Sequence, residues 1–259
     1  PPARARGGPI NGMTLAVRSP RRTATIGVDV GGTKIAAAVV DRSGTMLDVR
    51  HRPTPANDVV QIRDVIAGMV RDLRAEHDVY AVGVAAAGFV DAERSTVMFA
   101  PNLPWRGEPL RRELEQRTGL PVVVENDANA AAWAEARFGA GRGERHLVAV
   151  TVGTGVGGGI VEDGALVRGR FGAAAEVGHV VMVPGGRPCP CGLRGCLEQY
   201  ASGRALGRRA QEIASASPRL AQGLLERVGG RVDGMDGAAV TAAAQAGDPV
   251  SLRAFDEIG

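Results

Sequence analysis

The chain has 259 residues, of which 44% are apolar, and its formal net charge at pH 7 is only +3. No window reaches the ~18 consecutive apolar residues of a membrane helix, and the N-terminus lacks the apolar run of a signal peptide. The first 24 residues hold five arginines and no acid. A basic arm of this kind can touch nucleic acid, but a disordered leader over residues 1–24 is the more common case. We therefore expect a cytoplasmic globular protein that binds neither nucleic acid nor membrane.

Strands and helices alternate through the first half of the chain. Strands are expected over 25–30, 34–41 and 45–51, as an antiparallel meander, followed by a helix over 58–77. A strand over 79–88, a helix over 109–119 and a buried strand over 121–127 come next, and a helix over 128–139 follows directly. This alternation predicts an α/β fold whose sheet contains parallel strands.

The chain then repeats an earlier pattern. VTVGTGVGGGIVED, residues 150–163, matches VDVGGTKIAAAVVD, residues 28–41, as a strand, a glycine-threonine turn and a second strand. The repeat predicts two related lobes across a cleft, a small one over residues 25–126 and a larger one over 127–259. Helices are expected over 196–216, 217–229 and 236–247, and a last one is capped by Asp248 with Pro249 as its first residue.

The two glycine turns are candidate phosphate cradles, because glycine lets backbone N–H groups approach an anion closely. Either turn alone is also consistent with an ordinary hairpin, whereas two facing copies suit the phosphates of a nucleotide. Neither turn is a P-loop or a Rossmann fingerprint. The first contains Lys34, the single lysine among 31 basic residues, which is a weak indication of a phosphate nearby.

Asn126 and Asp127 stand where a buried strand gives way to a helix, at the edge where open α/β sheets bind ligands. At this position Asp127 can be a helix cap, or it can take a proton from a substrate hydroxyl. The residue pattern leaves both interpretations open.

All three cysteines fall in GHVVMVPGGRPCPCGLRGCLEQY, residues 178–200, together with a histidine. Cys189 and Cys191 are too close in sequence for an easy disulfide, which a cytoplasmic protein seldom keeps. Three thiolates and an imidazole form a four-ligand set for tetrahedral Zn²⁺, and a closed site of this kind is structural. Glu176 and Glu198 flank the cluster, either as surface charges or as acceptors for a substrate rich in hydroxyl groups.

DVGGTK, NDANAAA, TVGTGVGGG and ExGH followed by CxCGxxGCxE resemble the ROK family of sugar kinases, and in particular its bacterial ATP-dependent glucokinases. The resemblance runs from about residue 25 to the end. It implies the two-lobed actin-like (ribonuclease H-like) ATPase fold. It also implies that ATP phosphorylates glucose at its 6-hydroxyl, with Mg²⁺ and a structural Zn²⁺.

The family's site residues transfer to matching positions here. Asp127 is implied as the catalytic base. The implied sugar contacts are Gly88, Asn102, Asn126, Asp127, Glu176, His179 and Glu198. The implied zinc ligands are His179, Cys189, Cys191 and Cys196, with the second ring nitrogen of the histidine turned toward the sugar. The implied phosphate contacts are Asp29, Gly31, Gly32, Thr33, Lys34, Gly153, Thr154 and Gly155, and Asp29 would also help to place Mg²⁺.

The sequence leaves several alternative substrates, donors and functions open. The same wall of acceptors is compatible with another hexose, such as fructose, mannose or an N-acetylated hexosamine. A second alternative keeps the kinase but has polyphosphate as the donor. A sugar-responsive repressor is disfavoured, because the residues before the first strand are too few for a helix-turn-helix domain. Family members are commonly dimers or tetramers, so a homo-oligomer is expected. The family's later adenosine-binding segment has no counterpart before Gly259, so we also expect an incomplete second lobe and stronger binding of glucose than of ATP, as in an inactive sugar-binding fragment.

Overall fold

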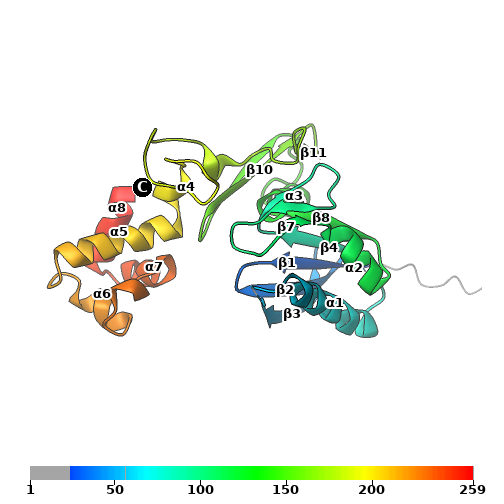
Figure 1. Ribbon diagram of the computed structural model, residues 1–259, viewed down its shortest axis with the longest axis horizontal. Coiled ribbons are helices and arrows are strands. Elements are labelled where there is room, and N and C mark those ends of the chain that lie inside the picture. Colours follow the sequence, from blue (N-terminus) through cyan, green and yellow to red (C-terminus); the bar gives the residue numbers. More distant parts are fainter. Residues whose placement is uncertain (1–23, 56, 259) are drawn as a thin grey trace, which may run out of the picture.

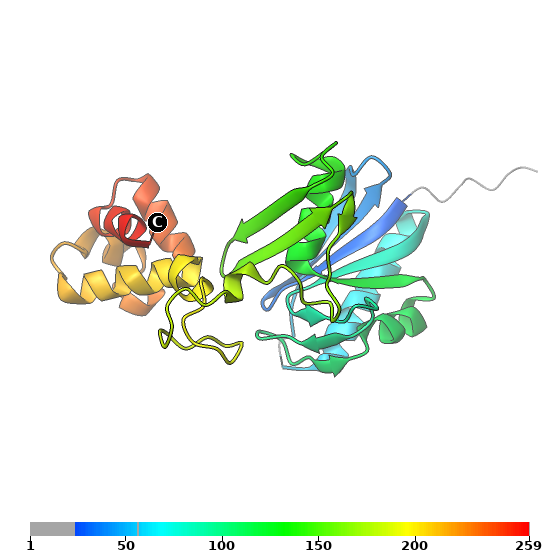
Figure 2. The same cartoon turned by 90° about the horizontal axis from the view of Figure 1, so that it is seen from above.

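The computed structural model describes residues 24–55 and 57–258; the tail expected over residues 1–24 lies outside them, apart from its last residue. Figures 1 and 2 show a part rich in sheet and a helical part, which are joined through β10 and the segment that carries the cysteines. None of the helices in the described ranges has the length and apolar content needed to cross a bilayer.

The sheet of the first part has the strand order β3-β2-β1-β4-β8, and its strands are β1 (Ala24–Val30), β2 (Lys34–Asp41), β3 (Met46–Pro53), β4 (Val79–Ala86) and β8 (Val122–Asn126). The first three strands pair antiparallel, and β4 and β8 extend the sheet in parallel. This arrangement confirms the predicted meander and the predicted parallel pairs.

Two helices, α1 (Val59–Glu76) and α2 (Leu110–Thr118), pack with this sheet and with each other. The helix α1 begins where Asp58 Oδ1 accepts the backbone N–H groups of Val60 and Gln61, at 2.8 and 3.0 Å. The helix α2 ends at Gly119, whose φ is 67°. Glycine adopts this left-handed conformation with little strain, whereas a Cβ atom makes it costly. The apolar side chains of α1 and the sheet form the first buried cluster.

Between β4 and α2 the chain forms a second, small antiparallel sheet from β5 (Phe89–Val90), β6 (Val97–Phe99) and β7 (Arg106–Glu108). The sequence pattern did not predict this sheet, because strands of two or three residues are too short to show alternation. Its last turn buries Trp105 completely.

A third sheet carries the repeated hairpin and consists of β9 (Leu147–Val152), β10 (Val156–Glu162) and β11 (Ala165–Leu166). The helix α3 (Asp127–Phe138) lies directly on it. A Cβ atom on Gly159 would stand 2.4 Å from Ala132 Cβ, and one on Gly157 would stand 2.7 Å from Ala128 Cβ. The glycine run of β10 therefore allows the close contact between this strand and the alanines of α3.

The helical part contains α4 (Glu198–Ala201), α5 (Gly203–Ala216), α6 (Gln222–Arg227), α7 (Gly237–Gln245) and α8 (Pro249–Ile258), and it has a separate buried cluster. The single helix predicted over 196–216 is interrupted, because Ser202 leaves the helical conformation and its hydroxyl accepts the N–H of Ala205. Asp248 caps the last helix as predicted and accepts the N–H of Ser251 at 2.8 Å.

Candidate active site

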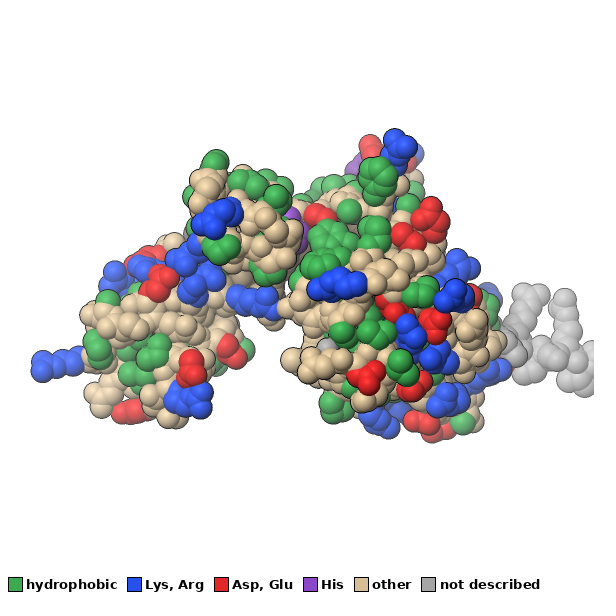
Figure 3. All heavy atoms as spheres, in the orientation of Figure 1, with side chains coloured by type: hydrophobic (Ala, Val, Ile, Leu, Met, Phe, Trp, Pro, Cys, Tyr) green, Lys and Arg blue, Asp and Glu red, His purple; other side chains and the backbone are tan. Residues whose placement is uncertain are grey.

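Both glycine turns open onto one cavity of about 690 Å³, and the space-filling view shows the surface hollowed between the two parts (Figure 3). Most of the residues singled out from the sequence line this cavity: Gly31, Gly32, Thr33, Gly88, Asn102, Asn126, Asp127, Gly153, Thr154, Gly155, Glu176, His179 and Glu198. Asp29 and Lys34 do not line it. The structure thus brings together residues that lie up to 167 positions apart, from Gly31 to Glu198.

The junction of β8 and α3 places Asn126 and Asp127 at the cavity. Asn126 is the helix cap, since its Oδ1 accepts the N–H of Asn129 at 2.9 Å. Its Nδ2 donates to Gly88 O and to Asp127 Oδ1, both at 3.1 Å. Asp127 Oδ1 also accepts the N–H of Ala128 at 2.9 Å. Asp127 Oδ2 has no hydrogen-bond partner among the described residues, so one carboxylate oxygen is held and the other is free to take a proton.

Three carboxylates share the cavity. Asp127 faces the open space but has protein atoms around it, and this desolvation, together with the charge of Asp29, raises its pKa above the ordinary value of 3.8. Burial, followed by the charges of Asp127 and Glu198, raises the pKa of Glu176 to about 7. The wall is therefore rich in hydrogen-bond acceptors, and it holds its negative charges close together.

Glu198 connects this wall to the second glycine turn. Its Oε2 accepts the backbone N–H of Val156 at 3.0 Å. A Cβ atom on Gly155 would stand 2.3 Å from the same oxygen, so a side chain at this position would displace the carboxylate. The glycine at 155 is thus needed for this contact.

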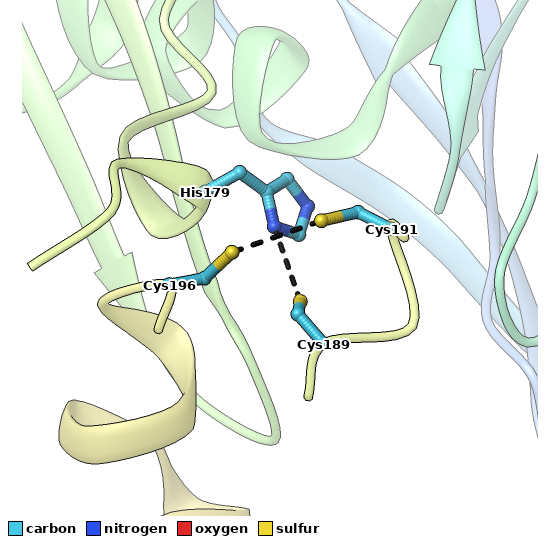
Figure 4. A group of neighbouring side chains, drawn as sticks. All are labelled: His179, Cys189, Cys191 and Cys196. Carbon is cyan, nitrogen blue, oxygen red and sulfur yellow. Dashed lines mark hydrogen bonds between the residues drawn. The ribbon is translucent and has the colours of Figure 1, made fainter. Parts of the chain in front are cut away.

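The four predicted metal ligands lie next to one another. His179, Cys189, Cys191 and Cys196 point toward a common centre (Figure 4), and their ligand atoms all lie within 4.8 Å of one another. The distance from Cys191 Sγ to Cys196 Sγ is 3.7 Å, and that from Cys189 Sγ to His179 Nδ1 is 3.6 Å. A tetrahedral Zn²⁺ with Zn–S of about 2.3 Å and Zn–N of about 2.0 Å sets these edges at about 3.7 and 3.5 Å. The donor set and its spacing fit zinc.

The loop that carries the ligands is folded by its own backbone. Gly192 and Gly195 have φ of 95° and 84°, and a Cβ atom on Gly195 would stand 1.7 Å from Val183 O. The N–H of Cys189 donates to Leu193 O at 2.8 Å, and that of Gly192 donates to Cys189 O at 3.0 Å. The loop then leads through Cys196 into α4, which starts with Glu198, so the metal ligands and the cavity wall belong to one short segment.

Phe89 and Arg204 are two of the lining residues that were not singled out from the sequence. The ring of Phe89 stacks on that of His179, with centroids 6.0 Å apart. Arg204 reaches across the cavity to Asn102. Phe89 directly follows Gly88, which was singled out, whereas Arg204 belongs to no recognisable motif and only the tertiary structure brings it to the site.

An α/β cleft with glycine turns from two hairpins, a carboxylate with one free oxygen and a polar wall has the parts of a kinase for a hydroxylated small molecule. The sequence profile of the ROK family matches residues 25–259, and the chain belongs to this family. Membership confirms the resemblance on which the site residues were assigned.

The chain is similar to a glucokinase from Streptomyces coelicolor, with 53% identity over 234 residues that cover 90% of this chain and 74% of the relative. It is 40% identical to a glucokinase from Thermotoga maritima over 235 residues, which cover 90% and 73% of the two chains. Among solved structures, a ROK family glucokinase from Streptomyces griseus in complex with glucose and AMPPNP superposes with a TM-score of 0.84 and 54% identity, over 91% of this chain and 75% of that one. The likeness confirms the actin-like ATPase fold.

Proposed function

We propose that the protein phosphorylates glucose with ATP and yields glucose 6-phosphate and ADP. The observation that carries this function is the single cavity that joins both glycine turns to Asp127 and its polar wall. The similarity to glucokinases at 53% identity supports the choice of sugar and donor.

Asp127 acts as the general base. Its free Oδ2 takes the proton of the sugar 6-hydroxyl while the hydroxyl oxygen attacks the γ-phosphorus in line and ADP leaves. Asn126 and the N–H of Ala128 hold Oδ1, so the carboxylate keeps its orientation during the transfer. The raised pKa of Asp127 makes it a better proton acceptor than an ordinary aspartate.

The remaining lining residues divide the cavity between sugar and phosphates. Glu176, His179, Glu198 and Asn102 offer acceptors and donors to the sugar hydroxyl groups. The backbone N–H groups of Gly31 and Gly153 donate within their own turns. The N–H groups left for the phosphates are those of Gly32, Thr33, Thr154 and Gly155. Mg²⁺ bound to these phosphates would neutralise part of their charge. Asp29 near the end of β1 is the candidate residue to hold it: Asp29 does not line the cavity, but its charge acts on Asp127, which does.

Zinc held by His179 and the three cysteines would stabilise the loop rather than take part in phosphoryl transfer. His179 Nδ1 is the ring nitrogen next to Cys189 Sγ, so Nε2 is left for the sugar. The ion would thereby fix the orientation of His179 and the start of α4 with Glu198.

We also propose a cytoplasmic location, since thiol ligands and ATP are both maintained there, and a homo-oligomeric state, which size-exclusion chromatography with light scattering measures directly.

The function is tested by a coupled assay of ADP and sugar phosphate formation over a panel of glucose, fructose, mannose and N-acetylated hexosamines. ATP and polyphosphate are compared as donors. We expect glucose with ATP to give the highest kcat/KM. Equal or higher kcat/KM with another hexose or with polyphosphate would contradict the proposed substrate or donor.

A further inference from the structure

The helix α5 starts directly beside the second glycine turn. The N–H of Gly203 donates to Gly153 O at 2.8 Å, and the N–H of Arg204 lies 3.4 Å from Thr154 O. A Cβ atom on Gly203 would stand 2.8 Å from Gly153 O, so glycine is needed for the helix to begin this close to the turn. Arg204 is thereby held at a defined place on the cavity wall.

From this place the side chain of Arg204 crosses to the opposite wall. Its Nη2 donates to Asn102 Oδ1 at 3.1 Å. Asn102 lies on the first glycine turn, because a Cβ atom on Gly32 would stand 3.3 Å from both the Cβ and the backbone oxygen of Asn102. One guanidinium therefore connects the helix beside the second turn to the loop that covers the first.

This contact decides how the Asn102 carboxamide is turned. A guanidinium has only N–H donors, so it can hold the amide by its oxygen but not by its nitrogen. With Oδ1 occupied, Nδ2 is left as the donor for a ligand, and it has no hydrogen-bond partner within the described part of the chain. Arg204 itself forms no ion pair with a carboxylate there, so its contact with Asn102 has no competing side-chain partner.

We propose that Arg204 is a positioning residue for sugar recognition. It holds the Asn102 carboxamide so that Nδ2 donates to a hydroxyl oxygen of the hexose, and it makes this contact depend on the seating of α5 against the second glycine turn. The inference rests on the proposed function and adds to it a residue of the second lobe that acts on sugar binding through a residue of the first.

The test compares Arg204→Ala, Arg204→Lys, Asn102→Ala and the double variant Arg204→Ala/Asn102→Ala. Glucose binding is measured by calorimetry and KM values by the coupled assay. We expect Arg204→Ala to weaken glucose binding and to raise the KM for glucose about 3- to 10-fold, the range of a single hydrogen bond. The kcat and the KM for ATP should stay within about twofold of the parent. The double variant should bind glucose no worse than Asn102→Ala, because both changes remove the same interaction, and Arg204→Lys should lie between parent and Arg204→Ala.

Arg209→Ala is the matched control, because Arg209 lies on the same helix but pairs with Glu212 and Glu257 instead of the cavity. Additive losses in the double variant, unchanged glucose binding in Arg204→Ala, or an effect confined to the KM for ATP would each overturn the inference. The last result would assign Arg204 to the phosphoryl donor. A parent protein that neither binds nor phosphorylates glucose would contradict the proposed function and this inference together, whereas an active parent with an unaffected Arg204→Ala variant contradicts the inference alone.

Discussion

The orientation of the Asp127 carboxylate depends on the preceding residue, Asn126. The cap of α3 is Asn126, whose side chain spans from the N–H of Asn129 to Gly88 O and to Asp127 Oδ1. Because Asn126 caps the helix, the carboxylate of Asp127 keeps one oxygen free in the cavity. Of the two interpretations left open by the sequence, the helix cap thus belongs to Asn126, and proton acceptance is what we propose for Asp127.

We predict that Asp127→Asn lowers kcat at least ~100-fold while glucose binding stays within a few-fold of the parent, because the amide keeps the shape of the carboxylate but cannot accept the proton. Turnover and calorimetric glucose titration are measured on the same preparation. An Asp127→Asn variant with kcat within a few-fold of the parent would show that this carboxylate is not the base.

The dependence of kcat/KM on acidic pH should also show the titration of Asp127. Desolvation and the charge of Asp29 raise the pKa of Asp127, and the neighbouring Glu176 has a pKa of about 7. A proton on Asp127 blocks acceptance of another, so activity is present above the raised pKa and lost below it. We expect the fall of kcat/KM for glucose with decreasing pH to begin above the range of an ordinary aspartate, through apparent pKa values that belong to the cluster. A fall of kcat/KM at or below pH 3.8 in folded protein would exclude a raised pKa.

At the scale of elements, the loop that carries Cys189, Cys191 and Cys196 leads directly into α4. Apolar side chains of the loop such as Val181 and Leu193 are exposed, and its glycines at positive φ allow the turns that bring the ligands together. Burial and the neighbouring thiols raise the pKa of Cys196 to about 12, so the cluster needs a cation to hold thiolates. Because Glu198 lies two residues after Cys196, we expect its position to depend on a metal bound by this cluster.

We predict close to one zinc per chain in protein purified without chelators, and a loss of this metal in Cys191→Ala. Metal binding of this kind contributes directly to folding, so the variant should unfold at a lower temperature and its KM for glucose should rise. Metal content, thermal unfolding and kinetics are measured together.

Arg194→Ala is the control, since Arg194 is exposed in the same loop and, within residues 24–55 and 57–258, its side chain forms a hydrogen bond only to Gly185 O. A parent protein with far less than one zinc, or a Cys191→Ala variant that keeps the metal, would refute the site.

At the scale of the whole molecule, the two largest buried clusters are separate. One cluster lies between the first sheet and the helices α1 and α2, and the other lies among the four helices α5, α6, α7 and α8. The two parts are connected mainly through the sheet of β9 to β11 and the loop that carries the three cysteines (Figures 1 and 2). Stability is therefore expected to be divided between two units.

We predict that Ile66→Ala and Leu224→Ala, each fully buried in a different cluster, cost about 2–5 kcal/mol of the stability of their own cluster. In a Trp133→Phe background Trp105 is the remaining tryptophan and reports on the first cluster. Ile66→Ala should shift the fluorescence transition, and Leu224→Ala should shift a loss of helical circular dichroism while the fluorescence midpoint stays nearly unchanged. Coincident transitions that both variants shift equally would show a single cooperative unit.

The elements with strong local signals were predictable from the sequence. The strands β1 and β2, the cap of α1 at Asp58 and the helix stop at Gly119 all agree with the residue pattern. The small sheet of β5 to β7 was not, because its pairing depends on contacts between short segments. The break before α5 was also missed, since Ser202 stands in a sequence that otherwise continues in helical periodicity.

By itself, the sequence determined the α/β class, the duplicated glycine hairpins, the four candidate metal ligands and the family, because these depend on residue type and short spacing along the chain. Only the tertiary structure decided which of Asn126 and Asp127 caps the helix, that Asp29 and Lys34 stay off the cavity wall, and that Arg204 reaches Asn102. These features depend on contacts between residues that are distant in sequence or on the direction of a side chain, and neither the periodicity nor the spacing of a chain encodes them.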